Sequence, residues 1–266
     1  MEIRVLGCYG SHLPGHGTTS FLLDETILID GGTITSVLSI EEQMKVGYVL
    51  LTHAHLDHIR DIMFLVDNIF YLQRKTPLVL VGSAGILETV HRHLFNGCVW
   101  PDFFTIPSRA APILKMAPIK VGEYLQVGSL RIQAVPVHHT VETLAYTIES
   151  ESDAVVFIGD TGPTDAVWDA ANMLDYLRAV FIETSFPNRL SELARLTRHL
   201  TPFALAREID KLTHQDAMIY AYHVKLHHDE EIEEELQALR QAGRIRLLHD
   251  GMRINVSPAG SGIISA

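Results

Sequence analysis

The segment from Thr52 to His58, with the sequence THAHLDH, constrains this chain more than any other. It places three imidazoles and one carboxylate within six positions, directly after the apolar run Tyr48–Leu51. A short apolar run of this kind indicates a buried strand, and the polar cluster begins where that strand should end. Neutral imidazole and carboxylate groups together bind divalent ions such as zinc, iron or manganese. We therefore predict a metal site here; the alternative is a histidine-rich turn that bonds to its own backbone.

The composition narrows the class of protein. Of 266 residues, 47% are hydrophobic and 20% charged, which is the balance of a soluble globular protein. No apolar stretch approaches the roughly 20 residues that cross a bilayer, and the first residues look like a strand rather than a secretion signal. Cys8 and Cys98 are the only cysteines, too few for a disulfide framework. We expect a cytoplasmic protein without a membrane partner.

The net charge of −11 argues against binding to a nucleic acid polymer or an anionic lipid surface, because both require a basic face. A small anionic substrate is still compatible with this charge. Two divalent ions, two carboxylate ligands and a hydroxide together leave a local charge of about +1 at the site.

Apolar runs and turn residues predict alternating strands and helices without an internal repeat or a flexible linker. Strands are expected at residues 3–6, 20–23, 26–29, 48–51, 78–81, 130–137, 144–148, 154–158, 179–182 and 218–222. Helices are expected at 59–73, 84–95, 164–177, 202–212 and 229–242, and a hairpin at 245–256 that turns at Asp250-Gly251. This order predicts an α/β fold, a four-layer αββα sandwich of two mixed sheets, with residues 1–266 as one domain. Residues 100–118 are irregular and could form a substrate lid, a dimer contact or a packed surface loop.

Further residues of ligand type follow other predicted strands. His138 and His139 follow one strand, Asp160 follows a second and His223 follows a third. Proteins of the α/β class place ligands at strand ends, where rigid elements meet and loops can reach a common point. We therefore expect these groups to converge with the THAHLDH segment.

With these motifs, the sequence resembles the metallo-β-lactamase superfamily over nearly its whole length. The resemblance implies a hydrolase with two divalent metal ions, zinc first, with manganese or iron as alternatives. By the family pattern, the first ion would be held by His53, His55 and His139, the second by Asp57, His58 and His223, and Asp160 would bridge both. Asp30, in the string Leu28–Gly32, would support these ligands from behind.

The choice between His138 and His139 rests on strand alternation and on the same resemblance. Adjacent side chains of a strand point to opposite faces, so only one of the two can face the ions. The phosphodiesterase branches of the superfamily carry a ligand His seven positions before a Tyr, which here matches His139 and Tyr146. We expect His139 to be the ligand and His138 to be packed or hydrogen-bonded.

Three strings resemble the class II cyclic nucleotide phosphodiesterases: IETSF at 182–186, RHLTP at 198–202 and YHVK at 222–225. Similar strings occur in the tRNA 3′-processing endonucleases (tRNase Z), which usually insert a long Gly/Pro-rich arm before the bridging Asp. Only about twenty residues separate His139 from Asp160 here, too few for such an arm. The resemblance thus implies a phosphodiesterase for small substrates, 3′,5′-cyclic nucleotides first, and suggests a homodimer.

The resemblance also implies a mechanism. Two ions roughly 3.5–4 Å apart would lower the pKa of a bridging water, and the resulting hydroxide would attack phosphorus. His199 would protonate the departing ribose oxygen, Glu183 would orient His199, and Asp57 would add proton transfer to its role as a ligand. Without the resemblance, His199 would be interpreted as a surface imidazole in a helix-capping segment.

Two other functions remain open from the sequence. A thioesterase or lactonase of the same superfamily would use the metal pair without His199. A non-catalytic nucleotide-binding protein would use the same fold, although the complete ligand set argues against it. The Gly-rich turn at 10–17, with His12 and His16, corresponds to a segment near the mouth of the site in the family and could contact substrate.

Overall fold

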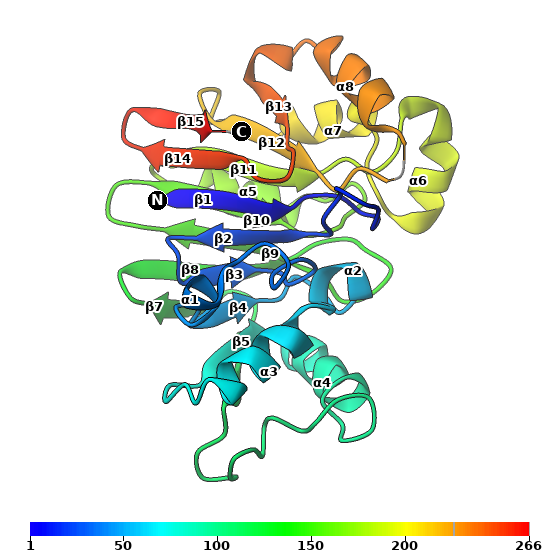
Figure 1. The fold of residues 1–266 in the computed structure, drawn as a ribbon. Coiled ribbons are helices and arrows are strands. Elements are labelled where there is room, and N and C mark those ends of the chain that lie inside the picture. Colours follow the sequence, from blue (N-terminus) through cyan, green and yellow to red (C-terminus); the bar gives the residue numbers. More distant parts are fainter. Residues whose placement is uncertain (226, 266) are drawn as a thin grey trace.

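The structure, a computed structural model, describes residues 1–225 and 227–265. Two mixed β-sheets pack face to face, and helices cover their outer faces (Figure 1). This confirms the predicted αββα arrangement. Within the described residues, no helix is long and apolar enough to cross a membrane. That residues 1–266 form one domain stays a prediction, supported by the core that the two sheets share.

The first sheet has the strand order β15-β14-β1-β2-β3-β4-β5-β6. Its strands are β1 (Glu2–Gly7), β2 (Ser20–Leu23), β3 (Ile27–Ile29), β4 (Tyr48–Leu50), β5 (Leu78–Gly82), β6 (Leu114–Pro118), β14 (Arg253–Ser257) and β15 (Gly260–Ser265). The second sheet has the order β13-β12-β11-β10-β9-β8-β7. Its strands are β7 (Tyr124–Val127), β8 (Leu130–Pro136), β9 (Leu144–Glu149), β10 (Ala154–Ile158), β11 (Leu177–Glu183), β12 (Met218–Tyr222) and β13 (Ile245–Leu247).

The helices are mostly short. They are α1 (Ile40–Gln43), α2 (Leu56–Ile59), α3 (Ile62–Tyr71), α4 (Ala84–His93), α5 (Ala166–Asn172), α6 (Ser191–Thr197), α7 (Pro202–Ile209) and α8 (Asp229–Gln237), with 3₁₀ turns at Asn188–Leu190 and Ala242–Arg244. α5 ends before the predicted 177 because Leu177 already belongs to β11. α8 starts at Asp229, but its N-cap is His228 rather than the expected Asp229.

Strand β10 shows how the layers are built. All five of its residues are buried, because one face packs on the other sheet and the opposite face packs on helices. Phe157 points between the sheets, where it stacks on Phe181 at 4.3 Å between ring centroids. Val156 and Ile158 belong to the separate cluster under α5, α7 and α8. Helices on one face and a sheet on the other hold the end of β10 in place.

The C-terminal segment differs from the prediction. β13 pairs in parallel with β12 in the second sheet, whereas β14 pairs antiparallel with β1 in the first. The expected hairpin at 245–256 is therefore wrong, and its Asp250-Gly251 turn is a crossover between sheets. The Asp250 carboxylate accepts hydrogen bonds from the backbone N–H groups of Cys8 at 3.0 Å and Gly17 at 2.5 Å. A local turn pattern cannot reveal that the flanking strands have distant partners.

The helix predicted at 59–73 corresponds to α3, and a separate helical turn, α2, ends at Ile59 just before it. Asp61 lies at the break, and its carboxylate accepts hydrogen bonds from the backbone N–H groups of Ile34 and Thr35, both at 2.6 Å. The apolar spacing continues through the break, so the sequence pattern does not show it. The break sets the direction of α2, which carries two of the predicted ligands.

The irregular segment 100–118 lies on the outer side of α3 and α4, away from α2 (Figure 1). Phe103 is buried and packs against Phe70 and Phe95, with ring centroids 5.4 and 6.4 Å apart. Its last five residues are not irregular but form the edge strand β6. Of the three expectations for this segment, a packed surface loop describes it best.

Candidate metal centre

The seven predicted ligands lie together at one end of the two sheets. Four of them follow β4 in the first sheet, and the others follow β8, β10 and β12 in the second. Among the described residues, three groups of side chains have ligand atoms that all lie within 4.8 Å of one another. One joins Asp160 and His223 to His199, and the other two divide the predicted ligands into His53, His55, His139 and Asp160 on one side and Asp57, His58 and His223 on the other. The division is the one that the family pattern implies for two ions.

Asp30 fixes the segment that follows β4. Its fully buried carboxylate accepts hydrogen bonds from the Thr52 N–H at 2.8 Å and the Thr52 hydroxyl at 2.7 Å. It also accepts a hydrogen bond from His58 Nδ1 at 2.7 Å, which leaves Nε2 of that ring for an ion. A carboxylate behind a histidine ligand sets its tautomer and orientation. The supporting role expected for Asp30 agrees with these contacts.

Tight backbone packing holds α2 against the segment that follows β3. A Cβ on Gly32 would lie 2.1 Å from the carbonyl oxygen of Asp57, so this position requires glycine. His55 is the N-cap of α2, and the single helical turn that follows presents Asp57 and His58 toward the other strand ends. The spacing of the motif thus follows from a strand end, a cap and one turn of helix.

His223 sits where β12 ends, in the left-handed backbone region at φ 69°. Its N–H donates to the carbonyl of Cys8 at 2.6 Å, and its Nδ1 lies 3.0 Å from the Ser185 hydroxyl. The free Nε2 lies 3.1 Å from His58 Nε2 and 3.2 Å from Asp160 Oδ2. Asp160 also lies 3.8 Å from His53 Nε2, so its carboxylate stands between the two groups.

The donor set fits a pair of divalent ions. His139 Nε2 and Asp160 Oδ1 are buried without a hydrogen-bond partner among the described residues, although buried polar atoms normally have one. His139 Nδ1 donates to the carbonyl of Arg198 at 3.0 Å, so its Nε2 carries a lone pair that faces the other ligands. Nitrogen and oxygen lone pairs that face one another in a buried site are satisfied when a cation binds between them.

Burial keeps most of the imidazoles in the neutral form that binds metals. Removal from water lowers the pKa of His223 to about 4 and also lowers the pKa of His53, His55 and His139. These rings would not have to release protons near neutral pH before they bind an ion.

Two members of the cluster shift the other way. Burial favours the neutral form of Asp160, but the nearby His223 and His58 hold its pKa well below the ordinary value. Burial likewise opposes protonation of His58, yet Asp160 and Asp30 raise its pKa well above the ordinary value. His58 and Asp160 therefore each favour the charged form of the other.

His199 lies beside the centre rather than on the surface. It is 8% exposed, and its ring centroid lies 5.0 Å from that of His139 and 5.5 Å from that of His223. Its Nδ1 donates to the fully buried Glu183 at 2.7 Å. Although burial opposes it, Glu183 raises the pKa of His199. The interpretation of His199 as a surface imidazole is wrong.

Glu183 is fixed in turn by the backbone around it. Its carboxylate accepts hydrogen bonds from the N–H groups of Thr161 at 3.3 Å and Leu200 at 3.2 Å, and from the Ser185 hydroxyl at 2.9 Å. Ser185 also reaches the rings of His199 and His223, so it joins the two halves of the site. The sequence analysis assigned no role to Ser185, although it lies in the IETSF string.

Two more residues near the site, His138 and Lys225, lie where the sequence did not place them. His138 is exposed, and among the described residues only its backbone is hydrogen-bonded, through its N–H to Thr161 and its carbonyl to Thr161 and Gly162, so the expectation that its side chain is packed or hydrogen-bonded is wrong. Lys225 was given no role, but its Nζ lies 3.5 Å from Asp57 Oδ2. Its position directly after His223 in the YHVK string was the available signal.

The chain matches a known protein family and several curated proteins. Residues 27–249 match the model of the Beta-lactamase superfamily domain. The chain is 26% identical over 187 residues to the "Probable 3′,5′-cyclic-nucleotide phosphodiesterase" of Yersinia pestis, covering 64% of this chain and 52% of that protein. It is 24% identical over 259 residues to the "3′,5′-cyclic-nucleotide phosphodiesterase" of Aliivibrio fischeri, covering 78% of this chain and 74% of that protein.

Proteins named ribonuclease Z are also among the relatives. The chain is 29% identical over 157 residues to a "Ribonuclease Z" of Clostridium acetobutylicum, covering 56% of this chain and 49% of that protein. The chain thus spans about half the length of the Yersinia and Clostridium relatives. Among solved structures, unliganded yeast PDE1 superposes with a TM-score of 0.82 at 19% identity, covering 95% of this chain and 98% of that one. At that identity, the likeness concerns the fold.

Proposed function

Because this chain belongs to the metallo-β-lactamase superfamily, we propose that it hydrolyses small phosphodiesters with two divalent metal ions, and that 3′,5′-cyclic nucleotides are its first candidate substrates. The observation that carries the proposal is the buried His199–Glu183 pair beside the two groups of metal ligands. Relatives named as cyclic nucleotide phosphodiesterases support the choice of substrate.

The ligands divide as the two groups do. One ion would be held by His53, His55 and His139, the other by Asp57, His58 and His223, with Asp160 between them. When bound, such ions supply Lewis acidity toward phosphoryl oxygens and an activated water at neutral pH. Zinc is the first choice for this ligand set, and manganese or iron would fit the same groups.

His199 supplies the proton for the leaving oxygen. Since its Nδ1–H is bound by Glu183, Nε2 is the nitrogen that can donate to substrate. As the bond from phosphorus to the ribose oxygen breaks, that oxygen takes the Nε2 proton, and the Glu183 carboxylate stabilises the ring while it is cationic. A proton-transfer role for Asp57 stays a proposal. Burial alone would raise the pKa of its carboxyl, but His223 and His58 hold it well below the ordinary value, which favours the carboxylate form that binds an ion.

The ribonuclease Z relatives make tRNA 3′-end cleavage the second candidate. Between His139 and Asp160 the chain forms β9, a four-residue connection and β10, and no arm extends from this interval. Together with the acidic net charge, this favours a small substrate over a polymer. A thioesterase or lactonase would leave the His199–Glu183 pair without a role. The expected homodimer stays a prediction.

The test is a substrate comparison on protein reconstituted with zinc, manganese or iron. We expect turnover of bis-p-nitrophenyl phosphate and of a cyclic nucleotide, with little turnover of thioesters or lactones. Elemental analysis should find two ions per chain. Turnover of acyl substrates alone, or of a tRNA precursor in preference to every small phosphodiester, would contradict the proposal.

A further inference from the structure

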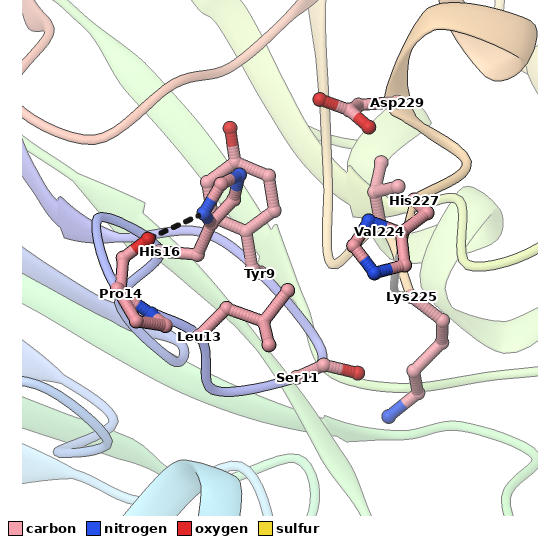
Figure 2. A pocket seen from close by; sticks show the side chains of 9 residues that line it. All are labelled: Tyr9, Ser11, Leu13, Pro14, His16, Val224, Lys225, His227 and Asp229. Atoms are coloured by element: carbon pink, nitrogen blue, oxygen red, sulfur yellow. Dashed lines mark hydrogen bonds between the residues drawn. The ribbon is translucent and has the colours of Figure 1, made fainter.

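A pocket of about 350 Å³ opens beside the metal centre (Figure 2). One wall is formed by the Gly-rich turn, with Tyr9, Leu13 and His16. The opposite wall follows β12 and includes Val224 and Lys225. Because Val224 directly follows the predicted ligand His223, the pocket adjoins the proposed site of cleavage.

The Gly-rich wall is held rigidly. The rings of Tyr9 and His16 meet edge to face with centroids 4.3 Å apart, and the Tyr9 hydroxyl lies 3.2 Å from His249 Nδ1. Asp250 fixes both ends of the turn through the N–H groups of Cys8 and Gly17. A preformed wall of rings and apolar side chains binds a flat group without a large cost in ordering.

Hydrogen bonds of Gly10 join this wall to the segment beside the metal centre. The Gly10 N–H donates to the carbonyl of Val224 at 3.0 Å, and the Gly10 carbonyl accepts a hydrogen bond from Lys225 Nζ at 2.6 Å. The same ammonium lies 3.5 Å from Asp57, one of the predicted ligands. The end of the pocket that faces the centre is therefore positively charged and suits a phosphate oxygen.

The far end carries the opposite charge. Asp229, the first residue of α8, lines the pocket, and Figure 2 shows its carboxylate on the opposite side from the Lys225 ammonium. Within the described parts of the chain, this carboxylate accepts no hydrogen bond and forms no ion pair. An ionised carboxylate only accepts hydrogen bonds, so it complements a group that presents N–H donors.

We propose that this pocket binds the base of a guanine nucleotide, with the phosphodiester at Lys225 and the metal centre and with Asp229 accepting hydrogen bonds from guanine N1–H and N2–H. This inference rests on the proposed function and names its substrate class. Guanine presents two adjacent donors on that edge, which match the two oxygens of one carboxylate. Adenine presents an acceptor, N1, beside its one amino group, so a carboxylate there repels it.

The test measures binding of 5′-GMP and 5′-AMP by calorimetry on the zinc-loaded protein; both are phosphomonoesters, so neither is turned over. We expect the wild-type protein to bind GMP about tenfold or more tighter than AMP, as for one good bidentate contact. Asp229→Asn replaces one acceptor by a donor, which matches adenine, so the preference should invert. Glu230→Gln is the matched control: it removes the same charge from the adjacent, exposed position and should keep the wild-type preference.

The binding result decides the inference independently of the proposed function. Equal affinity for GMP and AMP, or an unchanged ratio in Asp229→Asn, would overturn it. So would tighter binding of glycerophosphocholine than of GMP, since that would assign Asp229 to a cationic head group. Turnover of bis-p-nitrophenyl phosphate, which has no base, is measured beside it. Absence of that turnover with GMP preference intact would refute the hydrolase proposal and leave the base pocket standing.

Discussion

Gly10 controls the position of a predicted metal ligand from outside the ligand set. A Cβ at this position would lie 2.7 Å from Cε1 and Nδ1 of His223 and 2.8 Å from its carbonyl oxygen. Gly10→Ala should therefore turn or displace the ring, weaken binding of the second ion and destabilise the fold by about 1–3 kcal/mol. Elemental analysis and thermal unfolding measure both effects.

The control for this substitution is Gly47→Ala, whose Cβ would meet its nearest neighbour at an ordinary 3.8 Å. It should keep the wild-type metal content. Two ions per chain in Gly10→Ala would show that the ring of His223 does not need this clearance.

The proposed proton donor predicts a dependence on the leaving group. His199→Ala should retain both ions and lower the kcat for a cyclic nucleotide about 10²–10⁴-fold, because the ribose oxygen is a poor leaving group without a proton. It should slow bis-p-nitrophenyl phosphate far less, since nitrophenolate leaves without one. Parallel kinetics on the two substrates test this.

His138→Ala is the matched control, because its ring is exposed in the neighbouring loop. It should behave as wild type on both substrates. An equal loss on both substrates in His199→Ala would point to a role in the ligand arrangement instead of in proton transfer.

At the level of residues, the ligands of the THAHLDH segment can be predicted from the sequence because this motif lies within one strand end and one helical turn. The network behind it cannot. Ser185 and Lys225 reach the site only because β11 and β12 of the second sheet end at the same end of the molecule as β4 of the first, and no local pattern states how the two sheets are placed. For His138, strand alternation correctly predicts that its side chain points away from that of His139. Alternation does not predict whether that side chain is packed or exposed to solvent.

At the level of elements, Asp61 separates α2 from α3 and secures the connection after β3. Asp61→Ala removes the acceptor for the N–H groups of Ile34 and Thr35 and for the Thr35 hydroxyl. Bonds to an ionised acceptor are strong, so we expect a loss of about 2–4 kcal/mol in the free energy of unfolding. Urea denaturation measures the loss.

Asp67→Ala in α3 is the control, because this side chain is exposed. It should change the free energy of unfolding by less than about 0.5 kcal/mol. A similar effect of both substitutions would mean that the break in the helix is not held by Asp61.

Elements with uniform apolar runs were predicted closely, and elements whose identity depends on a partner were not. β10 and β12 have the bounds expected from their sequences, because buried strands are apolar throughout. The edge strand β7 and the Gly-containing β15 were missed, since one has polar residues on an open face and the other lacks β-branched residues at several positions. The false hairpin at 245–256 has the same origin: strand pairing is a property of the whole fold.

At the level of the whole molecule, the proposed ions would cross-link the two sheets, because their ligands follow β4 in one sheet and β8, β10 and β12 in the other. When the free ion concentration is 1,000 times the Kd, each bound ion stabilises the fold by about 4 kcal/mol, and its removal loses that amount. For a chain of this size, we expect a chelator to lower the Tm by about 10 °C or more. Thermal melts with EDTA, followed by addition of zinc, measure this shift.

His53→Ala provides the reference for that experiment, since a chain that has lost one ligand should show a smaller shift with the chelator. If the wild-type protein with two ions and the same protein stripped of both ions by the chelator melt at equal temperatures, the centre does not join the sheets.

The contact between Asp250 and the Gly-rich turn has a consequence for how the protein is made. Gly17 and Asp250 are 233 positions apart in the chain. A ribosome must therefore translate almost all of these residues before the turn gains its anchor. Ligands that need this turn, whether nucleotide or ion, would meet a nascent polypeptide that cannot yet retain them, and capture would begin only after Asp250 has left the ribosome.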